Sequence, residues 1–75
     1  MEEMAAKGKD VELGSRVRAV RVGKAPFTVP AGTRGTVDYI SRVNVEGSRF
    51  TQVGVRWDDD RYFICCLPPD ALEVL

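Results

Sequence analysis

The sequence predicts an all-β domain built from five short strands. From about residue 13 onward, apolar residues recur in short alternating runs, and no 3.6-residue period is long enough for a helix. Gly, Pro and Asp separate these runs, as turn residues do. At 75 residues the chain is near the lower size limit for a domain with its own core. We therefore expect one small domain over residues 13–75, after a flexible, charge-alternating tail at residues 1–12.

The first predicted strand covers residues 15–22. Val17 and Ala19 share one face of this strand, whereas Val20 and Val22 share the other. The apolar pattern therefore changes phase in the middle of the strand. Such a change is typical of a β-bulge, which lets one strand serve two neighbouring parts of a small barrel.

The second predicted strand covers residues 35–41 and follows a ten-residue loop at residues 23–32. A Pro-Ala-Gly sequence closes the loop and is typical of a type II turn. The strand carries Val37 on one face, and the sequence pattern does not assign Tyr39 to either face. A polar connection over residues 42–48 leads to the next strand.

The third predicted strand, residues 49–57, shows the clearest alternation in the chain. Its apolar face consists of Thr51, Val53, Val55 and Trp57. Three consecutive Asp residues at 58–60 form the next turn, although a Gly would be more usual there. The fourth strand, residues 61–67, is the most apolar segment. Residues 68–72 then predict a single 3₁₀ turn before a fifth strand at residues 73–75.

This order of elements, with its long first loop, tight hairpin and final 3₁₀ turn, predicts a five-stranded SH3-like barrel. Four stretches also resemble a family of small SH3-like proteins of unknown function from bacteria and phages. They are LGSRVR at 13–18, PAGTRGTV at 30–37, VRWD at 55–58 and LPPDALE at 67–73. In that family they correspond to a glycine-led basic strand, a PxGTxGTV corner, a VxWD hairpin and a proline-led final turn. The resemblance implies a fold and no particular activity.

The absence of histidine excludes several kinds of active site. Without histidine the chain has no Ser-His or Cys-His nucleophile, no His general base and no His-containing metal motif. We therefore expect a protein that is not an enzyme and that uses no cofactor. The carboxylates of Asp58, Asp59 and Asp60 favour a solvated turn, with a weak cation site as the alternative.

The two cysteines, Cys65 and Cys66, are adjacent, so a disulfide between them would close no loop. Alternation along a strand places one thiol inward and the other outward, and which of them faces the core stays open. Free thiols suit a reducing compartment, and no apolar stretch reaches the roughly 18 residues of a membrane-spanning helix. We therefore expect a cytoplasmic protein with no membrane partner.

The net charge of zero hides an uneven distribution. Residues 7–49 carry nine Lys or Arg against four acidic residues, whereas residues 50–75 carry two against five. The predicted binding residues form a basic cluster: Arg16, Arg18, Arg21, Lys24 and Arg34. Such a cluster can contact phosphates or an acidic protein surface, or it can protect an edge strand from aggregation. Phe27 in the first loop and Phe50 on a polar face are the aromatic residues that we expect to be exposed contacts.

Two functions follow from this pattern. The first is a small accessory or regulatory protein-interaction module that docks through its basic first strand and loop onto a protein partner, such as an acidic one. The second is a nucleic-acid-binding barrel that uses the same basic face. The neutral net charge, the acidic turn and the lack of aromatic stacking platforms argue against the second. The sequence leaves the identity of the partner and the oligomeric state open.

Overall fold

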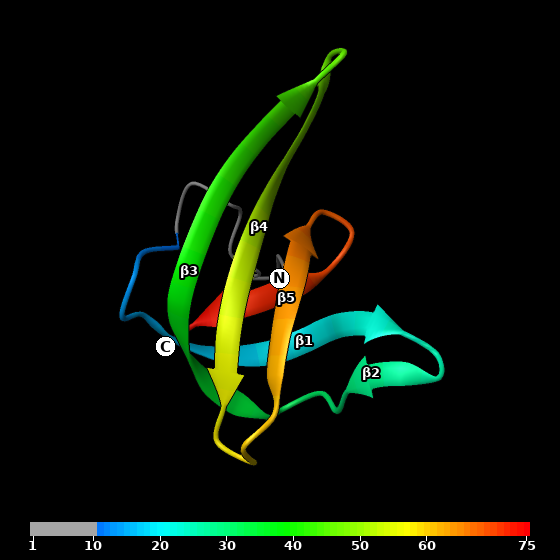
Figure 1. The fold of residues 1–75 in the computed structure, drawn as a ribbon. Helices are drawn as coiled ribbons and strands as arrows, with labels where there is room; N and C mark the ends of the chain where they lie inside the picture. The colour runs from blue at the N-terminus through cyan, green and yellow to red at the C-terminus, as the bar shows by residue number, and fades with distance from the viewer. Residues whose placement is uncertain (1–10) are drawn as a thin grey trace, which may run out of the picture.

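The computed structural model describes residues 11–75 and contains six antiparallel β-strands in one sheet (Figure 1). The strands are β1 (Arg16–Lys24), β2 (Phe27–Val29), β3 (Arg34–Val45), β4 (Ser48–Trp57), β5 (Tyr62–Leu67) and β6 (Ala71–Val74). Their order is β2-β1-β3-β4-β5, and β6 pairs with β1 off this path. The all-β prediction is therefore confirmed. Most of the predicted tail lies outside the described residues, but Val11 near its end is fully buried in the core.

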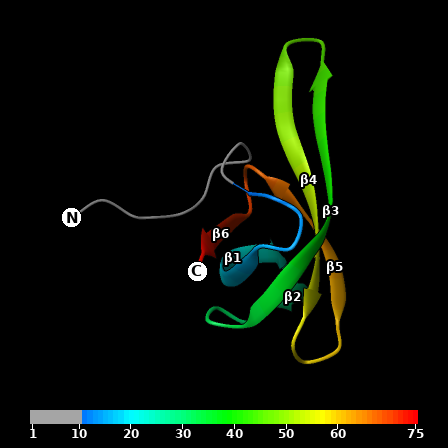
Figure 2. The same ribbon diagram turned by 90° about the vertical axis from the view of Figure 1, so that its left-hand side faces the viewer.

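Two groups of strands face each other across the core (Figure 2). β3, β4 and β5 form one side, and β1, β2 and β6 lie on the other. β1 pairs with β3 at Arg16–Arg18, with β6 over residues 17–21, and with β2 at its end. Its register with β6 shifts between Ala19 and Arg21, which confirms the predicted bulge. Because of this shift, Val22 is buried on the core side.

The core centres on β4, whose alternation is the clearest in the sequence. The buried residues of β4 include all four members of the predicted apolar face, Thr51, Val53, Val55 and Trp57. The neighbouring strand β5 contributes Cys65, which is fully buried, while Cys66 is half-buried. The structure thus confirms that the two thiols lie on different faces and shows that Cys65 faces the core. Val37 of β3 is also buried, whereas Tyr39 is exposed because the β3–β4 register shifts between these two residues.

The prediction of a ten-residue first loop is wrong, because β2 lies within it. Phe-Thr-Val is a strand-forming sequence, and its three residues pair antiparallel with the end of β1. Only Ala25 and Pro26 remain between the two strands. Gly23 makes this close pairing possible, since its φ is 84° and an added Cβ would lie 2.2 Å from the carbonyl oxygen of Phe27.

The predicted polar connection at residues 42–48 is also wrong, because most of it belongs to a long hairpin of β3 and β4. Val43 and Val45 alternate with polar residues and continue β3, and the pairing runs as far as Val45 opposite Ser48. The turn consists of Glu46 and Gly47, which have φ values of 49° and 83°. Two consecutive positive φ values are typical of a tight hairpin turn. The tip of this hairpin projects beyond β5 (Figure 1).

The predicted Asp turn at residues 58–60 is confirmed. Asp60 donates its N–H to the carbonyl oxygen of Trp57 at 3.0 Å, and Trp57 donates to the carbonyl oxygen of Arg61 at 2.8 Å. Asp60 has a φ of 73°, a left-handed conformation that Asp tolerates better than most residues. A glycine is therefore not required at this position.

The predicted 3₁₀ turn after β5 is not formed. Residues 68–70 make a turn in which Asp70 donates its N–H to the carbonyl oxygen of Cys66 at 2.8 Å. The Asp70 carboxylate accepts the N–H of Cys66 at 2.9 Å and the N–H of Gly23 at 3.0 Å. Asp70 thus joins the end of β5 to the end of β1, instead of capping a helical turn.

Candidate functional site

A groove runs along the edge of β5, between this strand and the hairpin of β1 and β2. It consists of two hollows, of about 590 Å³ and about 260 Å³, and Phe63 lines both of them. The larger hollow has the size of many ligand pockets, which span about 300–1,000 Å³. We call this feature the β5 groove and define it by six of its residues: Arg21, Lys24, Phe27, Phe63, Ile64 and Cys66.

The predicted basic cluster is divided between two surfaces. Arg21 and Lys24 line the larger hollow of the β5 groove. Arg16, Arg18 and Arg34 lie on the sheet instead, where the register of β1 with β3 places Arg18 directly opposite Arg34. The structure therefore does not bring the five cations together at one site.

On the sheet surface, two of the three arginines are paired with carboxylates. Arg16 donates to both carboxylate oxygens of Asp58, at 2.9 and 2.7 Å, and Arg18 forms an ion pair with Glu73. The hydrogen-bonded Arg16 guanidinium holds the pKa of the Asp58 carboxyl below its ordinary value. These pairs neutralise much of the positive charge that the sequence places on β1. This surface therefore attracts an anion less strongly than unpaired arginines would.

The two cations of the larger hollow, Arg21 and Lys24, form no ion pair with a carboxylate among residues 11–75. Arg21 donates instead to the carbonyl oxygen of Pro69, at 3.1 and 3.3 Å. This contact orients the guanidinium and leaves its charge unneutralised. Lys24 is exposed. Asp70 lines the same hollow, and its two carboxylate oxygens accept backbone N–H groups, which hold the carboxylate in place and leave its negative charge.

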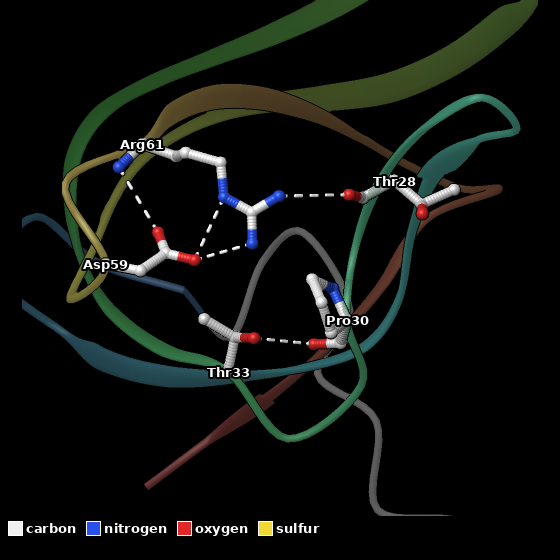
Figure 3. A network of polar contacts seen from close by, with 5 residues as sticks. All are labelled: Thr28, Pro30, Thr33, Asp59 and Arg61. Carbon is white, nitrogen blue, oxygen red and sulfur yellow. Dashed lines mark hydrogen bonds and ion pairs between the residues drawn. The ribbon is translucent and has the colours of Figure 1, made fainter.

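Arg61 lines the smaller hollow of the β5 groove, and Figure 3 shows its polar contacts. Its guanidinium donates to Asp59, with an Nε–Oδ2 distance of 2.9 Å, and to the carbonyl oxygen of Thr28 at 3.2 Å. Asp59 thereby fixes an arginine that bridges from the β4–β5 turn to β2. Beside this network, the Thr33 hydroxyl donates to the carbonyl oxygen of Pro30 at 2.7 Å and closes the turn before β3.

The acidic turn is accordingly engaged in arginine contacts. Asp58 binds Arg16 and Asp59 binds Arg61, on different sides of the turn. Within residues 11–75, no three cysteine or acidic side chains gather as a metal site would require. The divergence of Asp58 and Asp59 agrees with the solvated-turn interpretation.

The two predicted aromatic contacts have different positions. Phe27 is 76% exposed and lines the smaller hollow of the β5 groove, whereas Phe50 is half-buried on the long hairpin opposite Val43. Phe63 and Ile64 were not predicted as groove residues. The sequence of residues 61–67 indicates such exposed apolar residues, because apolar side chains occupy both faces of the strand. Only one of these faces can pack against the core.

The outer face of β3, β4 and β5 carries a second exposed patch. Tyr39 and Tyr62 meet over Gly54, where an added Cβ would lie 2.2 Å from the Tyr62 hydroxyl. The guanidinium of Arg56 lies 5.9 Å from the centre of the Tyr62 ring, at the distance of a cation–π contact. Arg56 is also 3.7 Å from Asp38. The cation of this patch therefore has internal partners, in contrast to those of the β5 groove.

The two thiols should differ in reactivity, and this difference tests the orientation of β5. Burial, aided by the nearby Asp70 charge, raises the pKa of the Cys65 thiol to about 12. We expect a maleimide at mildly alkaline pH to modify one thiol in the folded protein and both in denaturant. A Cys66→Ser variant should lose the modification of the folded state. Native labelling that persists in this variant would contradict the orientation.

Comparison with known proteins does not identify a relative. No protein-family model matches the chain, and neither curated proteins nor solved structures give a match. In the part of the chain that the structure describes, no helix is long and apolar enough to cross a membrane. Function is therefore inferred from the geometry of the β5 groove.

Proposed function

We propose that this chain is a protein-binding module without catalytic activity, which holds an acidic segment of a protein partner in the β5 groove. One observation carries this proposal. Arg21 and Lys24 line an apolar hollow, and neither forms an ion pair with a carboxylate among residues 11–75. Among the described residues, Asp70 is the one carboxylate that lines this hollow, so two cations face one anion there. An apolar pocket with a few convergent polar groups is the usual form of a binding site.

The lining of the groove favours a polypeptide over a nucleic acid. Phe63, Ile64 and Pro69 supply apolar surface to the same hollow as the two cations, and this combination suits a segment that carries both apolar and acidic side chains. A nucleic acid would need a longer row of free cations along its phosphates. Arg16 and Arg18, which would extend such a row on β1, are bound to Asp58 and Glu73.

The proposed absence of catalysis rests on the side chains that are present. The chain has no histidine, and burial keeps the Cys65 thiol protonated at neutral pH. Asp58 and Asp59 are held by arginines in an exposed turn, where the pKa of each carboxyl lies below its ordinary value. A general acid needs a raised pKa and a site that excludes water.

We further propose that the sheet belongs to the SH3-like class of small barrels, as the sequence resemblance implies, and that the β5 groove is its open seam. β1 pairs with both β3 and β6, which curls the sheet, and Arg61 reaches from the β4–β5 turn to Thr28 of β2. Free thiols at Cys65 and Cys66 support a cytoplasmic location.

The proposed function is tested by titrating the full chain with short peptides in which Glu alternates with Val. Calorimetry should detect binding of these peptides, and peptides in which Lys replaces Glu should not bind. An R21E/K24E variant should lose about tenfold or more in affinity, because it reverses both groove charges. The R34E/R49E variant changes the net charge equally at exposed residues outside the groove and should bind like the unmodified chain.

Three results would overturn the proposal. The first is no binding of the Glu peptides by the unmodified chain. The second is an equal loss of affinity in the R21E/K24E and R34E/R49E variants. The third is tighter, salt-sensitive binding of a single-stranded oligonucleotide than of any Glu peptide, which would favour the nucleic-acid hypothesis.

A further inference from the structure

The β5 groove contains an unpaired strand edge. β5 is an end strand of the sheet and pairs only with β4 among the described strands. Because Trp57 donates to the carbonyl oxygen of Arg61, the alternation of the antiparallel ladder directs the backbone groups of Phe63 and Cys65 toward β4. The N–H and C=O groups of Tyr62 and Ile64 then point away from β4, into the groove.

The contacts of Asp70 support this phase of the ladder. Cys66 is the next residue whose backbone groups should point away from β4, and both of them are bound by Asp70. The carboxylate of Asp70 accepts the Cys66 N–H and its own N–H donates to the Cys66 carbonyl oxygen, as a residue of a neighbouring strand would. Asp70 therefore ends the open edge on one side, and Arg61, bound to Thr28, ends it on the other.

We infer that the acidic segment binds as an additional β-strand on the edge of β5, hydrogen-bonded to the backbone of Tyr62 and Ile64. This inference rests on the proposed function and specifies its partner as an extended segment of another protein. Strand addition to an open sheet edge is a general mode of peptide recognition, in which backbone hydrogen bonds supply affinity and alternate side chains supply specificity.

The charge of the larger hollow favours an acidic occupant, because Arg21 and Lys24 outnumber Asp70, its one carboxylate in the part of the chain that the structure describes. In an extended segment, alternate side chains point to opposite faces. Phe63 packs against the core on the side of β5 that faces β1, whereas Ile64 lies on the opposite face and is exposed. A segment of alternating apolar and acidic residues can then direct its acidic set toward Arg21 and Lys24 on β1 and its apolar set toward Ile64. A basic segment would instead bring like charges together in the groove.

The test uses the full chain and three peptides in which Glu alternates with Val. One peptide is unmodified, one is N-methylated at its Val residues, and one is N-methylated at its Glu residues. In an added strand, the N–H groups of one residue type face β5 and those of the other type face away. We expect one of the two N-methylated peptides to lose about tenfold or more in affinity, while the other binds like the unmodified peptide.

Substitution of Ile64 gives an independent readout. Ile64→Pro removes an N–H that points away from β4, so the β4–β5 ladder keeps its donors, while Ile64→Val keeps the N–H. The unmodified peptide should bind the Pro variant about tenfold more weakly than the Val variant, with both variants folded by circular dichroism. The amide of Ile64 should also exchange more slowly when the peptide is bound.

The outcomes separate this inference from the proposed function. If both N-methylated peptides bind with equal affinity and the R21E/K24E variant still loses binding, strand addition is wrong and the acid-binding groove remains. If the unmodified chain binds none of the three peptides, the proposed function is wrong and the inference falls with it. Ile64 exchange that does not change at saturation with the unmodified peptide would also overturn strand addition.

Discussion

Asp70→Ala should lower the free energy of unfolding by about 2–3 kcal/mol. The substitution leaves two backbone N–H groups, those of Gly23 and Cys66, without the carboxylate that accepts them. An unsatisfied buried donor costs about 1–3 kcal/mol, and these two are partly buried. In a domain of this size, such a loss lowers the Tm by roughly 10–15 °C. Urea and thermal denaturation followed by circular dichroism measure both quantities.

The control for this prediction is a pair of Asn variants. Asp70→Asn keeps one acceptor oxygen and replaces the other with an NH₂ group, so an intermediate loss is expected. Asp60→Asn changes the same chemical group in an exposed turn, where Asn also tolerates the left-handed φ of 73°. It should be close to neutral. An Asp70→Ala variant within about 0.5 kcal/mol of the unmodified chain would show that Asp70 does not join β5 to β1.

Gly35→Ala should be more damaging still, with a loss of about 3 kcal/mol or more. A Cβ on Gly35 would lie 2.7 Å from Cγ1 of Val55, 2.8 Å from the carbonyl oxygen of Arg56 and 2.9 Å from Cε3 of Trp57. Overpacking of a core typically costs about 1–3 kcal/mol, and one of these three contacts is with backbone that cannot move independently. The unfolding midpoint in urea should fall accordingly.

Gly14→Ala is the matched control, because it adds the same methyl group without a collision. Gly14 has a φ of 87°, and an added Cβ would meet nothing within 4 Å. We expect only the cost of a left-handed alanine, about 1–2 kcal/mol. If the two variants lose equal stability, the close packing of β3 against Val55 and Trp57 is not as described.

Alternation made part of the fold predictable from sequence. The apolar face of β4 that ends at Trp57 and the opposite orientations of the two cysteines followed from a period of two residues. β2 could not be predicted, because three residues beside two prolines do not establish a period. The extension of β3 to Val45 was missed because Glu46 accepts a left-handed φ that local sequence seldom assigns to glutamate.

The candidate site was predictable only in part. Contacts between residues distant in sequence determine which of the cations form ion pairs and which line the groove. Arg21, Lys24 and Phe27 were identified from their residue types and do line the β5 groove. Nothing local distinguishes them from Arg16, which is neutralised by a carboxylate 42 residues away. The partnership of Asp70 with a backbone N–H on β1 is equally long-range. The sheet topology brings such partners together, and a single sequence does not reveal them.

NMR locates a bound peptide on the chain residue by residue. ¹H–¹⁵N spectra of the full chain are recorded during a titration with the unmodified peptide of alternating Glu and Val. We expect the largest shifts on the amides of Gly23, Lys24, Ile64 and Cys66, which would place the peptide in the β5 groove. Shifts centred on Arg34, or on the outer patch over Gly54, would contradict this location, as would a spectrum that does not change.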